Sequence, residues 1–471
     1  MQHLKYSYYI IVSAPVEENT KRILYSTRSG DMLLVTEACY QALITDAIDL
    51  LPETIKLKLI NSKILVPVDE EELSTIIREN IEYAETPNNQ LYEVIQPTAM
   101  CQLGCYYCGQ KHTKDTLEDS LIDKMVTRIH SKFTQSTYNE IYLGWFGAEP
   151  LMGISKMRII YDRLTQAIDN PLIPIRGKIV TNGLSLKVGI FQELVSKFKI
   201  DKIEITLDGA ADFHDAHRYT KSGEGSFEII YNNLKNFLRS SDFSKSNCSV
   251  VIRCNVDEKN INGIEPLIYQ LANDNLHTLI DTLYFVGVYS WGGNDAHKKA
   301  LTKEKFAMLK LRWEILKVGL GYKHRKRLMA RKLQTCVATG GNSEVYDAFG
   351  NIYNCTEIPY ADFYNGTSYK LGNLSSDYKS IFTSKPHNDW YAIVRDTNRF
   401  PCHSCKLLPV CGGSCPKSWE EGNPACPSFK FSIAKELEFE YLLRKEPTED
   451  LSKSLKTFDA SLSEKDFYRY E

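Results

Sequence analysis

The chain has 471 residues, of which 25% are charged and 43% are apolar, and its formal net charge is −2. This length exceeds the usual size of one hydrophobic core and predicts two or three domains. The near-neutral charge gives no basic field for nucleic acid, and no apolar run is long enough to cross a membrane. An odd number of cysteines, 13, with tight C-x2-C spacings favours metal clusters in a reducing compartment, so we expect a cytoplasmic location.

The first 85 residues contain no cluster motif and mix short strands with helices. The opening stretch alternates polar with apolar residues, so it is predicted to be a strand and not a signal peptide. We expect strands at Tyr6–Ser13, Arg22–Ser26 and Ile64–Val68, and helices at Glu37–Ile48, at Glu53–Ile60 and from Glu70. Thr86–Asn89 is predicted to be a linker.

Residues 90–320 alternate strands with helices. Apolar or β-branched runs predict six strands, at Tyr92–Pro97, Glu140–Phe146, Lys178–Thr181, Lys202–Leu207, Ser249–Asn255 and Thr282–Val288. After the first strand, a 3.6-residue apolar pattern from Leu121 to Phe133, capped by Asp119 or Ser120, predicts a helix. Six such units predict an α/β fold, a partial (β/α)6 TIM-like barrel whose chemistry lies at the carboxyl ends of its strands.

The first of these strands is followed by three cysteines, Cys101, Cys105 and Cys108, in a C-x3-C-x2-C loop. Iron–sulfur clusters usually take four thiolates, so three from one loop suggest a [4Fe–4S] centre with one iron open to another ligand. A zinc site with His112 as a further ligand is the alternative, and three unrelated buried cysteines are a third possibility.

Short polar segments also follow the next three strands: Gly147–Pro150, Thr181–Gly183 and Thr206–Gly209. Each segment alone is common turn chemistry. In a parallel barrel, however, all of them lie on the same rim as the cysteine loop. Their order and shared rim make the combination far more specific than any one segment.

This combination resembles the radical S-adenosylmethionine enzymes. The resemblance implies that the open iron binds the cosubstrate, which is then cleaved reductively to a 5′-deoxyadenosyl radical. Glu149 and its neighbours would bind the methionyl amino group, although Ala148 stands where the family has a glycine. Arg218 would pair with the methionyl carboxylate; its alternative is a surface ion pair with Asp212 or Asp215. The implied S-adenosylmethionine contacts are Tyr107, Gly147, Ala148, Glu149, Thr181, Asn182, Thr206, Asp208 and Arg218.

Seven more cysteines lie between residues 330 and 430, and their order resembles the SPASM domain, which carries auxiliary iron–sulfur clusters. The resemblance assigns auxiliary cluster I to Cys336, Cys355 and Cys415, called here the near set. It assigns auxiliary cluster II to Cys402, Cys405, Cys411 and Cys426, called here the far set. With the cysteine loop, this gives three [4Fe–4S] clusters.

The near set has only three cysteines. Relatives with a complete set have another cysteine a few residues earlier, whereas this chain has Lys326–Arg331 there. The remaining iron is therefore expected to be open to a substrate thiolate, or else filled by Cys248, Cys254 or a ligand that is not cysteine. Otherwise, lone cysteines such as Cys39 are expected to be small core residues.

The element order of residues 1–85 resembles the winged-helix leader-recognition domain of enzymes that mature ribosomally made peptides. Its alternative is a structural cap on the barrel. We expect domains at 1–85, 90–320 (barrel) and 330–430 (SPASM), with a helical tail at 431–471. The dense basic run Lys323–Arg327 is expected to be a solvated helix face or a site that attracts an acidic peptide.

The whole pattern predicts a radical S-adenosylmethionine maturase that cross-links a precursor peptide through a thioether or carbon–carbon bond. Its partners would be the peptide with its leader and an electron donor similar to flavodoxin or ferredoxin, without nucleic acid or membrane. An anaerobic sulfatase-maturing enzyme that makes formylglycine is the alternative enzyme, and an iron–sulfur electron carrier or scaffold is the non-enzymatic alternative. No single residue stands out as the general base.

Overall fold

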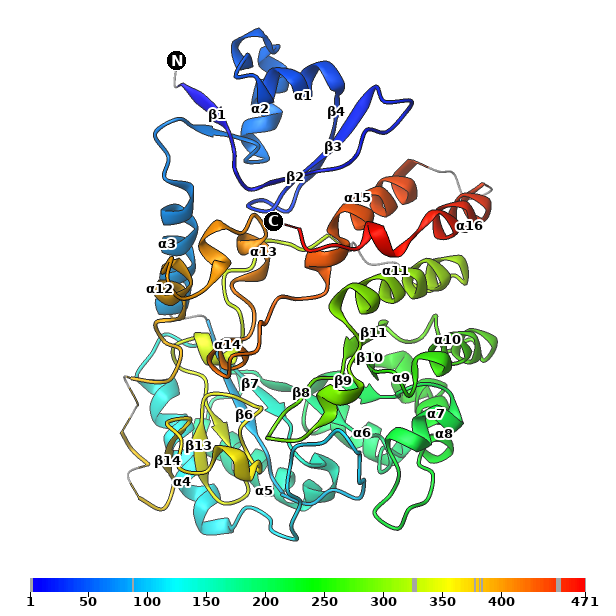
Figure 1. Cartoon of the computed structure of the whole chain (residues 1–471). Helices are drawn as coiled ribbons and strands as arrows, with labels where there is room; N and C mark the ends of the chain where they lie inside the picture. Colours follow the sequence, from blue (N-terminus) through cyan, green and yellow to red (C-terminus); the bar gives the residue numbers. More distant parts are fainter. Residues whose placement is uncertain are drawn as a thin grey trace.

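The computed structural model describes residues 3–86, 89–323, 328–376, 378–380, 382, 384–445 and 450–470. An N-terminal part lies at the top of Figure 1, a barrel at the bottom, and the cysteine-rich part between and beside them. The predicted linker at 86–89, the basic run at 323–327 and the stretch at 326–331 lie partly outside the described residues. Within the described residues, no helix combines the length and apolarity that a membrane span requires.

The barrel is a run of six parallel strands, which confirms the predicted fold class. Each strand pairs with the next in chain order, so the six carboxyl ends share one rim. The strands are β6 (Gln90–Ile95), β7 (Glu140–Trp145), β8 (Ile175–Thr181), β9 (Ile200–Thr206), β10 (Ser249–Val256) and β11 (Thr282–Gly287). The larger helices of this part are α4 (Asp119–Thr134), α5 (Ile154–Ile168), α6 (Val188–Ser196), α8 (Phe227–Leu238), α10 (Ile264–Asn273) and α11 (Lys303–Gly319).

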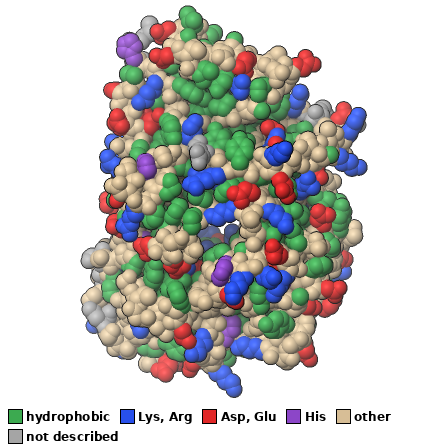
Figure 2. All heavy atoms as spheres, in the orientation of Figure 1, with side chains coloured by type: hydrophobic (Ala, Val, Ile, Leu, Met, Phe, Trp, Pro, Cys, Tyr) green, Lys and Arg blue, Asp and Glu red, His purple; other side chains and the backbone are tan. Residues whose placement is uncertain are grey.

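The two faces of this sheet differ in polarity, because successive residues of each strand point to opposite faces. Side chains such as Leu143, Ile203 and Ile252 are buried in the main hydrophobic core with residues of the surrounding helices. Their neighbours along the strands, including Glu204 and Arg253, face the other way, because successive strand residues alternate between faces. The barrel interior is therefore polar, and Figure 2 shows a hollow bordered by basic side chains near the centre of the visible face.

The predicted cap of the first barrel helix is wrong by one or two positions. Helix α4 begins at Asp119 and its N-cap position is Glu118, which makes no side-chain capping bond. The Asp119 carboxylate instead contacts Lys156, at 2.7 Å, and Arg163, at 3.3 Å, on α5. Ion pairing between two neighbouring helices thus replaces the expected cap.

The cysteine-rich part extends the barrel sheet. Strand β12 (Val345–Tyr346) pairs in parallel with β6, and β13 (Asn351–Tyr353) and β14 (Lys370–Asn373) follow as antiparallel neighbours. A buried charge cluster fastens this junction: Glu344 accepts two 2.7 Å bonds from Arg128 and lies 3.2 Å from Lys132, which also pairs with Glu93. The remaining helices are α12 (Trp390–Arg395), α13 (Leu408–Cys411), α14 (Pro416–Glu420), α15 (Phe429–Lys445) and α16 (Leu451–Ser461).

The N-terminal part contains two small sheets and three helices. Strands β1 (Leu4–Tyr6) and β5 (Leu65–Pro67) form an antiparallel pair, and β2 (Ile10–Val12), β3 (Lys21–Ser26) and β4 (Met32–Thr36) form a three-stranded sheet. The helices are α1 (Glu37–Ile44), α2 (Glu53–Asn61) and α3 (Glu72–Glu85). The prediction missed β4, and its helix to Ile48 ends earlier, at Ile44.

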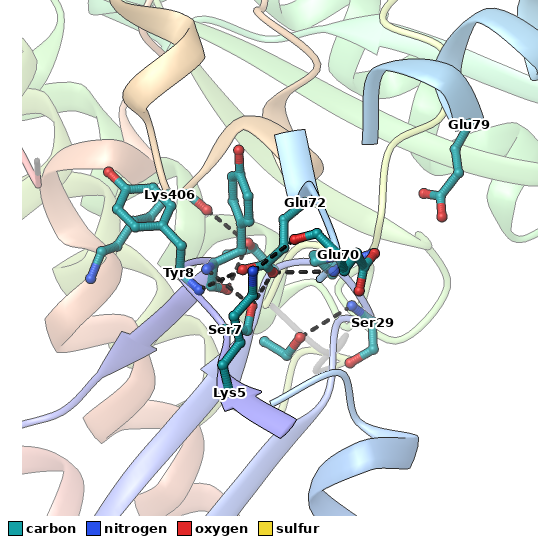
Figure 3. Close-up of polar contacts among 12 residues, drawn as sticks. Lys5, Ser7, Tyr8, Ser29, Glu70, Glu72, Glu79 and Lys406 are labelled. Carbon is teal, nitrogen blue, oxygen red and sulfur yellow. Dashed lines mark hydrogen bonds and ion pairs between the residues drawn. The ribbon is translucent and has the colours of Figure 1, made fainter. Parts of the chain in front are cut away.

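The predicted single strand Tyr6–Ser13 is also wrong, because the chain bends between β1 and β2. At the bend, the Glu72 carboxylate accepts bonds from Ser7 Oγ, at 2.5 Å, and from the Tyr8 backbone N–H, at 3.0 Å (Figure 3). Arg28 holds Glu72 and Glu70 in place, at 3.1 and 2.7 Å. The first strand therefore ends where the backbone bonds the carboxylate of Glu72, which lies 64 residues after Tyr8 in the sequence.

Hydrogen bonds from this bend and from Thr27, which follows β3, attach the N-terminal part to the cysteine-rich part. Tyr8 Oη donates to the carbonyl of Ser404, at 2.6 Å, and Thr27 Oγ1 donates to that of Lys406, at 2.7 Å. Helix α3 packs on α12 through a small apolar core that includes Ile76, Trp390 and Cys402. The N-terminal part thus touches the loop that carries the first far-set cysteines.

Candidate active site

The three loop cysteines lie beyond the end of β6, on the rim predicted for the chemistry. Cys101 is buried and Cys105 and Cys108 are half-buried. Burial raises the pKa of the Cys101 thiol to about 12 and that of Cys105 to about 11, although the charge of Arg218 opposes both shifts. The thiols therefore stay protonated at neutral pH until a metal displaces the protons.

Within the described residues, no three His, Cys, Asp or Glu side chains converge as ligands of a single metal ion do. A cubane cluster distributes its thiolates over separate irons, so they lie farther apart than the ligands of one zinc ion. For His112, the proposed zinc ligand, burial lowers the pKa to about 4.

Glu149 joins the rim segments that follow β7 and β8. Its buried carboxylate accepts bonds from Thr181 Oγ1, at 2.7 Å, from the Asn182 N–H, at 2.7 Å, and from the Leu151 N–H, at 3.0 Å. Asn182 in turn donates to Gln102 Oε1, at 3.3 Å, beside Cys101. An ionised carboxylate has about four acceptor sites, so one remains for an ammonium group.

The turn before Glu149 has left-handed backbone at Gly147 (φ +79) and at Ala148 (φ +32). A Cβ on Gly147 would lie 2.4 Å from the Gln96 side chain, so only glycine fits there. Ala148 tolerates positive φ, at a cost of about 1 kcal/mol, and its N–H donates to Gln110 Oε1, at 3.0 Å. The alanine in the family's glycine position is therefore accommodated as strained backbone.

A buried network joins the cysteine loop to the ends of β9 and β10. Tyr107 Oη donates to Asp208 Oδ2, at 2.5 Å, and accepts bonds from Arg218, at 2.7 Å, and Asn255 Nδ2, at 3.0 Å. Burial alone would raise the pKa of Asp208, but His217, whose Nδ1 lies 3.9 Å from the carboxylate, and the charge of Arg218 lower it to about 2. The structure therefore gives Tyr107 and Asp208 the role of orienting Arg218.

Arg218 is not part of a surface ion pair, which was the alternative for this residue. It is 7% exposed, and Asp215 instead accepts bonds from the N–H groups of Ser226 and Phe227. Arg218 Nε is buried and has no hydrogen-bond partner within the described residues. A buried guanidinium with an unused donor fits an anionic ligand such as the methionyl carboxylate. Thr206, also implied as a contact, is buried at the end of β9.

The four far-set cysteines line one pocket, together with Trp419, Phe429 and Lys430. They come from separate short elements: Cys402 lies in a 3-10 turn and Cys405 directly follows it, Cys411 ends α13, and Cys426 precedes α15. Burial and the neighbouring sulfurs raise the pKa of Cys402 and of Cys411 to about 12. The geometry fits four thiolates around one cluster.

The near-set cysteines also come together, and Glu357 lies among them. Burial raises the pKa of the Cys355 thiol well above its usual value, and the charge of Glu357 and the sulfurs of Cys336 and Cys415 raise it further. Glu357 Oε2 also accepts a 3.4 Å bond from Tyr289. Glu357 is therefore a charged group close to the near set.

The two cysteines considered as further near-set ligands lie elsewhere. Cys248 and Cys254 are buried in the main hydrophobic core, among the residues between the strands and the helices. Cys39 packs against the core of the N-terminal part. The expectation that lone cysteines are core residues is confirmed, and neither barrel cysteine completes the near set.

Sequence reasoning missed two polar rim residues. Asn255 ends β10 and bonds both Tyr107 and Asp208, at 3.0 and 3.2 Å. Gln96 follows β6 and is 1% exposed. Neither the Nε2 nor the Oε1 atom of its side chain has a hydrogen-bond partner in the described part of the chain. Their positions at strand ends were the available signal, because the same rule located the other rim segments.

Residues 95–258 match the model of the Radical SAM superfamily. Over 171 residues the chain is 27% identical to an uncharacterised protein of Synechocystis sp., a match to 35% of this chain and only 42% of that protein. Over 371 residues it is 21% identical to the serine-type anaerobic sulfatase-maturating enzyme of Bacteroides thetaiotaomicron, a match to 70% of this chain and 83% of that enzyme.

Two solved structures have a similar fold. The structure of native anSMEcpe with bound AdoMet and Cp18Cys peptide aligns with a TM-score of 0.54 and 18% identity, and covers 78% of this chain and 99% of that chain. Streptococcus suis SuiB bound to precursor peptide SuiA aligns with a TM-score of 0.50 and 15% identity, and covers 90% and 98%. At these identities the likeness establishes the fold alone.

The chain contains a radical S-adenosylmethionine domain, which includes all four rim segments and Arg218. Its overall fold is similar to those of anSMEcpe and SuiB. Proteins of this superfamily bind S-adenosylmethionine and a [4Fe–4S] cluster, which together supply the 5′-deoxyadenosyl radical. The predicted radical S-adenosylmethionine domain is therefore matched over residues 95–258.

Proposed function

We propose that this chain cross-links a ribosomally made precursor peptide by radical chemistry. A 5′-deoxyadenosyl radical removes a hydrogen atom from a peptide side chain, and a thioether or carbon–carbon bond follows. We assign leader recognition to residues 1–85, the radical step to 90–320, the auxiliary clusters to 330–430 and a helical tail to 431–471. Three [4Fe–4S] clusters, S-adenosylmethionine and a flavodoxin- or ferredoxin-like electron donor complete the proposal.

The N-terminal part carries this proposal. Among the described strands, β4 pairs only with β3, so in that part of the chain its other edge is open to a peptide strand. Large apolar side chains are exposed in this part of the chain: Leu34 on β4 at 41%, Leu50 after α1 at 83% and Leu57 on α2 at 58%. The top of Figure 2, where this part lies, shows apolar surface in green. Such a concentration is typical of a binding surface and is not needed for a structural cap.

Replacing Leu34 by Glu is expected to weaken precursor binding at least tenfold. An added strand beside β4 would cover this side chain, and its burial is worth about 1.5–3 kcal/mol. Cleavage of S-adenosylmethionine without peptide should not change, because Leu34 is far in sequence from the rim. Leu172, which is 85% exposed on the barrel, provides the matched control Leu172→Glu. Equal precursor affinities for both variants would favour the structural-cap alternative.

The near set supports a thioether as the bond formed. Three cysteines leave one iron for another ligand, and the two barrel cysteines face the core. A substrate thiol bound there would lose its proton and be held as a thiolate beside the barrel. A carbon–carbon cross-link would need no such ligand.

In a protein that lacks the loop and far-set cysteines, the spectrum of the near cluster should therefore change when a Cys-containing precursor is added. The precursor with Ser in place of Cys should leave the spectrum unchanged. The same response to both peptides would contradict thiolate binding. A spectrum unchanged by either peptide, with binding intact, would favour the carbon–carbon bond.

Oxidation of a protein Cys or Ser to formylglycine is the second candidate function. The similarity to the sulfatase-maturating enzyme of B. thetaiotaomicron favours it. The free edge of β4 and the three-cysteine near set favour the peptide maturase. An electron carrier or scaffold would use neither the Arg218 Nε, which has no partner within the described residues, nor the remaining acceptor site of Glu149.

A further inference from the structure

Lys430 lies against the far set of cysteines. It is the second residue of α15 and is only 5% exposed. Its Nζ donates a hydrogen bond to Cys405 Sγ, at 3.3 Å, and its side chain lines the pocket that the four far-set cysteines share. A buried ammonium group therefore points at a sulfur expected to bind iron.

This ammonium group has no ordinary counterion. Within the described part of the chain, it forms no ion pair with a carboxylate, whereas Lys435 on the same helix pairs with Glu438 at 2.9 Å. Burying an unpaired cation is costly, so a nearby anion is required. Four thiolates around an iron–sulfur cluster would provide that negative charge.

We propose that Lys430 is a positioning residue that raises the reduction potential of the far-set cluster. The proposal rests on the assignment of Cys402, Cys405, Cys411 and Cys426 as its ligands. Net charge and hydrogen bonds to the sulfurs are two of the factors that set such potentials. The reduced cluster carries one more negative charge than the oxidised one, so the ammonium stabilises the reduced form more. The far cluster thereby becomes a better acceptor for an electron that leaves the substrate.

The backbone around Lys430 keeps this arrangement in place. The Lys430 N–H donates to the carbonyl of Pro427, at 3.1 Å, and its own carbonyl accepts from Tyr470 N–H, also at 3.1 Å. These bonds hold the start of α15, which begins three residues after Cys426. The orientation of the ammonium is thus determined by the fold and does not depend on a flexible surface side chain.

The test is a potentiometric titration of the reconstituted full chain, followed by electron paramagnetic resonance, in a background that lacks the loop cysteines. Lys430→Met should lower the reduction potential of one auxiliary cluster by at least about 59 mV, which is a tenfold change in the one-electron reduction equilibrium. Lys430→Arg should largely restore the potential, and Lys435→Met should leave it unchanged. Iron content is measured on every sample.

An unchanged potential in Lys430→Met with full iron content would overturn the inference. If Lys430→Met loses the cluster, Lys430→Gln, which keeps an N–H donor without the charge, is measured instead. A lower potential for Lys430→Gln supports the inference, and the wild-type potential overturns it. Failure of the ligand assignment itself would be distinguishable, because replacing the far-set cysteines would then leave the iron content unchanged.

Discussion

Replacing Cys101, Cys105 and Cys108 together by Ala is expected to abolish reductive cleavage of S-adenosylmethionine and to remove about a third of the bound iron. The three cysteines come from one loop on the barrel rim, close to the charge of Arg218, and together they are the proposed ligands of the cluster that S-adenosylmethionine cleavage requires. Formation of 5′-deoxyadenosine under anaerobic reducing conditions measures the loss.

Cys248→Ala is the matched control, because this cysteine is buried in the hydrophobic core. It should keep its full iron content and its cleavage activity, with at most a modest loss of stability. Cleavage retained by the triple variant would rule out the mechanism. Loss of iron in the control would show that iron content reports folding and not ligation.

Replacing Glu344 by Ala is expected to destabilise the junction between the barrel and the cysteine-rich part by about 3–5 kcal/mol. Glu344 is completely buried and neutralises Arg128 and Lys132, with Lys385 3.7 Å away. Removing its carboxylate leaves the buried Arg128 without its carboxylate partner, and Lys132 keeps only Glu93. Glu193 forms a two-bond pair with Arg158 at the surface. Replacing Glu193 by Ala should therefore lower the free energy of unfolding by only about 0–1 kcal/mol.

Urea unfolding of both variants measures this difference, and equal losses would contradict a dominant role for the buried cluster.

The same cluster predicts a pH dependence of stability. Burial alone would raise the pKa of Glu344, but the charges of Lys132 and Arg128 lower it below its usual value. The stabilisation is thus complete at neutral pH. It declines as the pH falls below about 4, where the unfolded carboxyl takes up a proton. Glu344→Ala should flatten this acid limb.

The sequence predicted the barrel well because each β/α unit is defined locally. Runs such as Glu140–Phe146 and Ser249–Asn255 were placed within about one residue, since apolar and β-branched residues mark them directly. The rule that chemistry follows strand ends then located Glu149 and Asp208 on a common rim.

What the sequence did not predict depends on contacts between distant residues. The bend at Ser7 requires Glu72, which lies 65 residues away, and β12 is only two residues long and exists through pairing with β6. The sulfur contact of Lys430 likewise requires α15 to fold back on the loop that carries Cys405. No local pattern encodes such long-range pairings.

Counting iron and sulfide in the anaerobically reconstituted protein tests the central claim most directly. The three cysteine sets predict about twelve iron and twelve sulfide atoms per chain, as three [4Fe–4S] clusters require. Values near four of each would leave only the cluster of the radical S-adenosylmethionine domain and would contradict the assignment of the near and far sets.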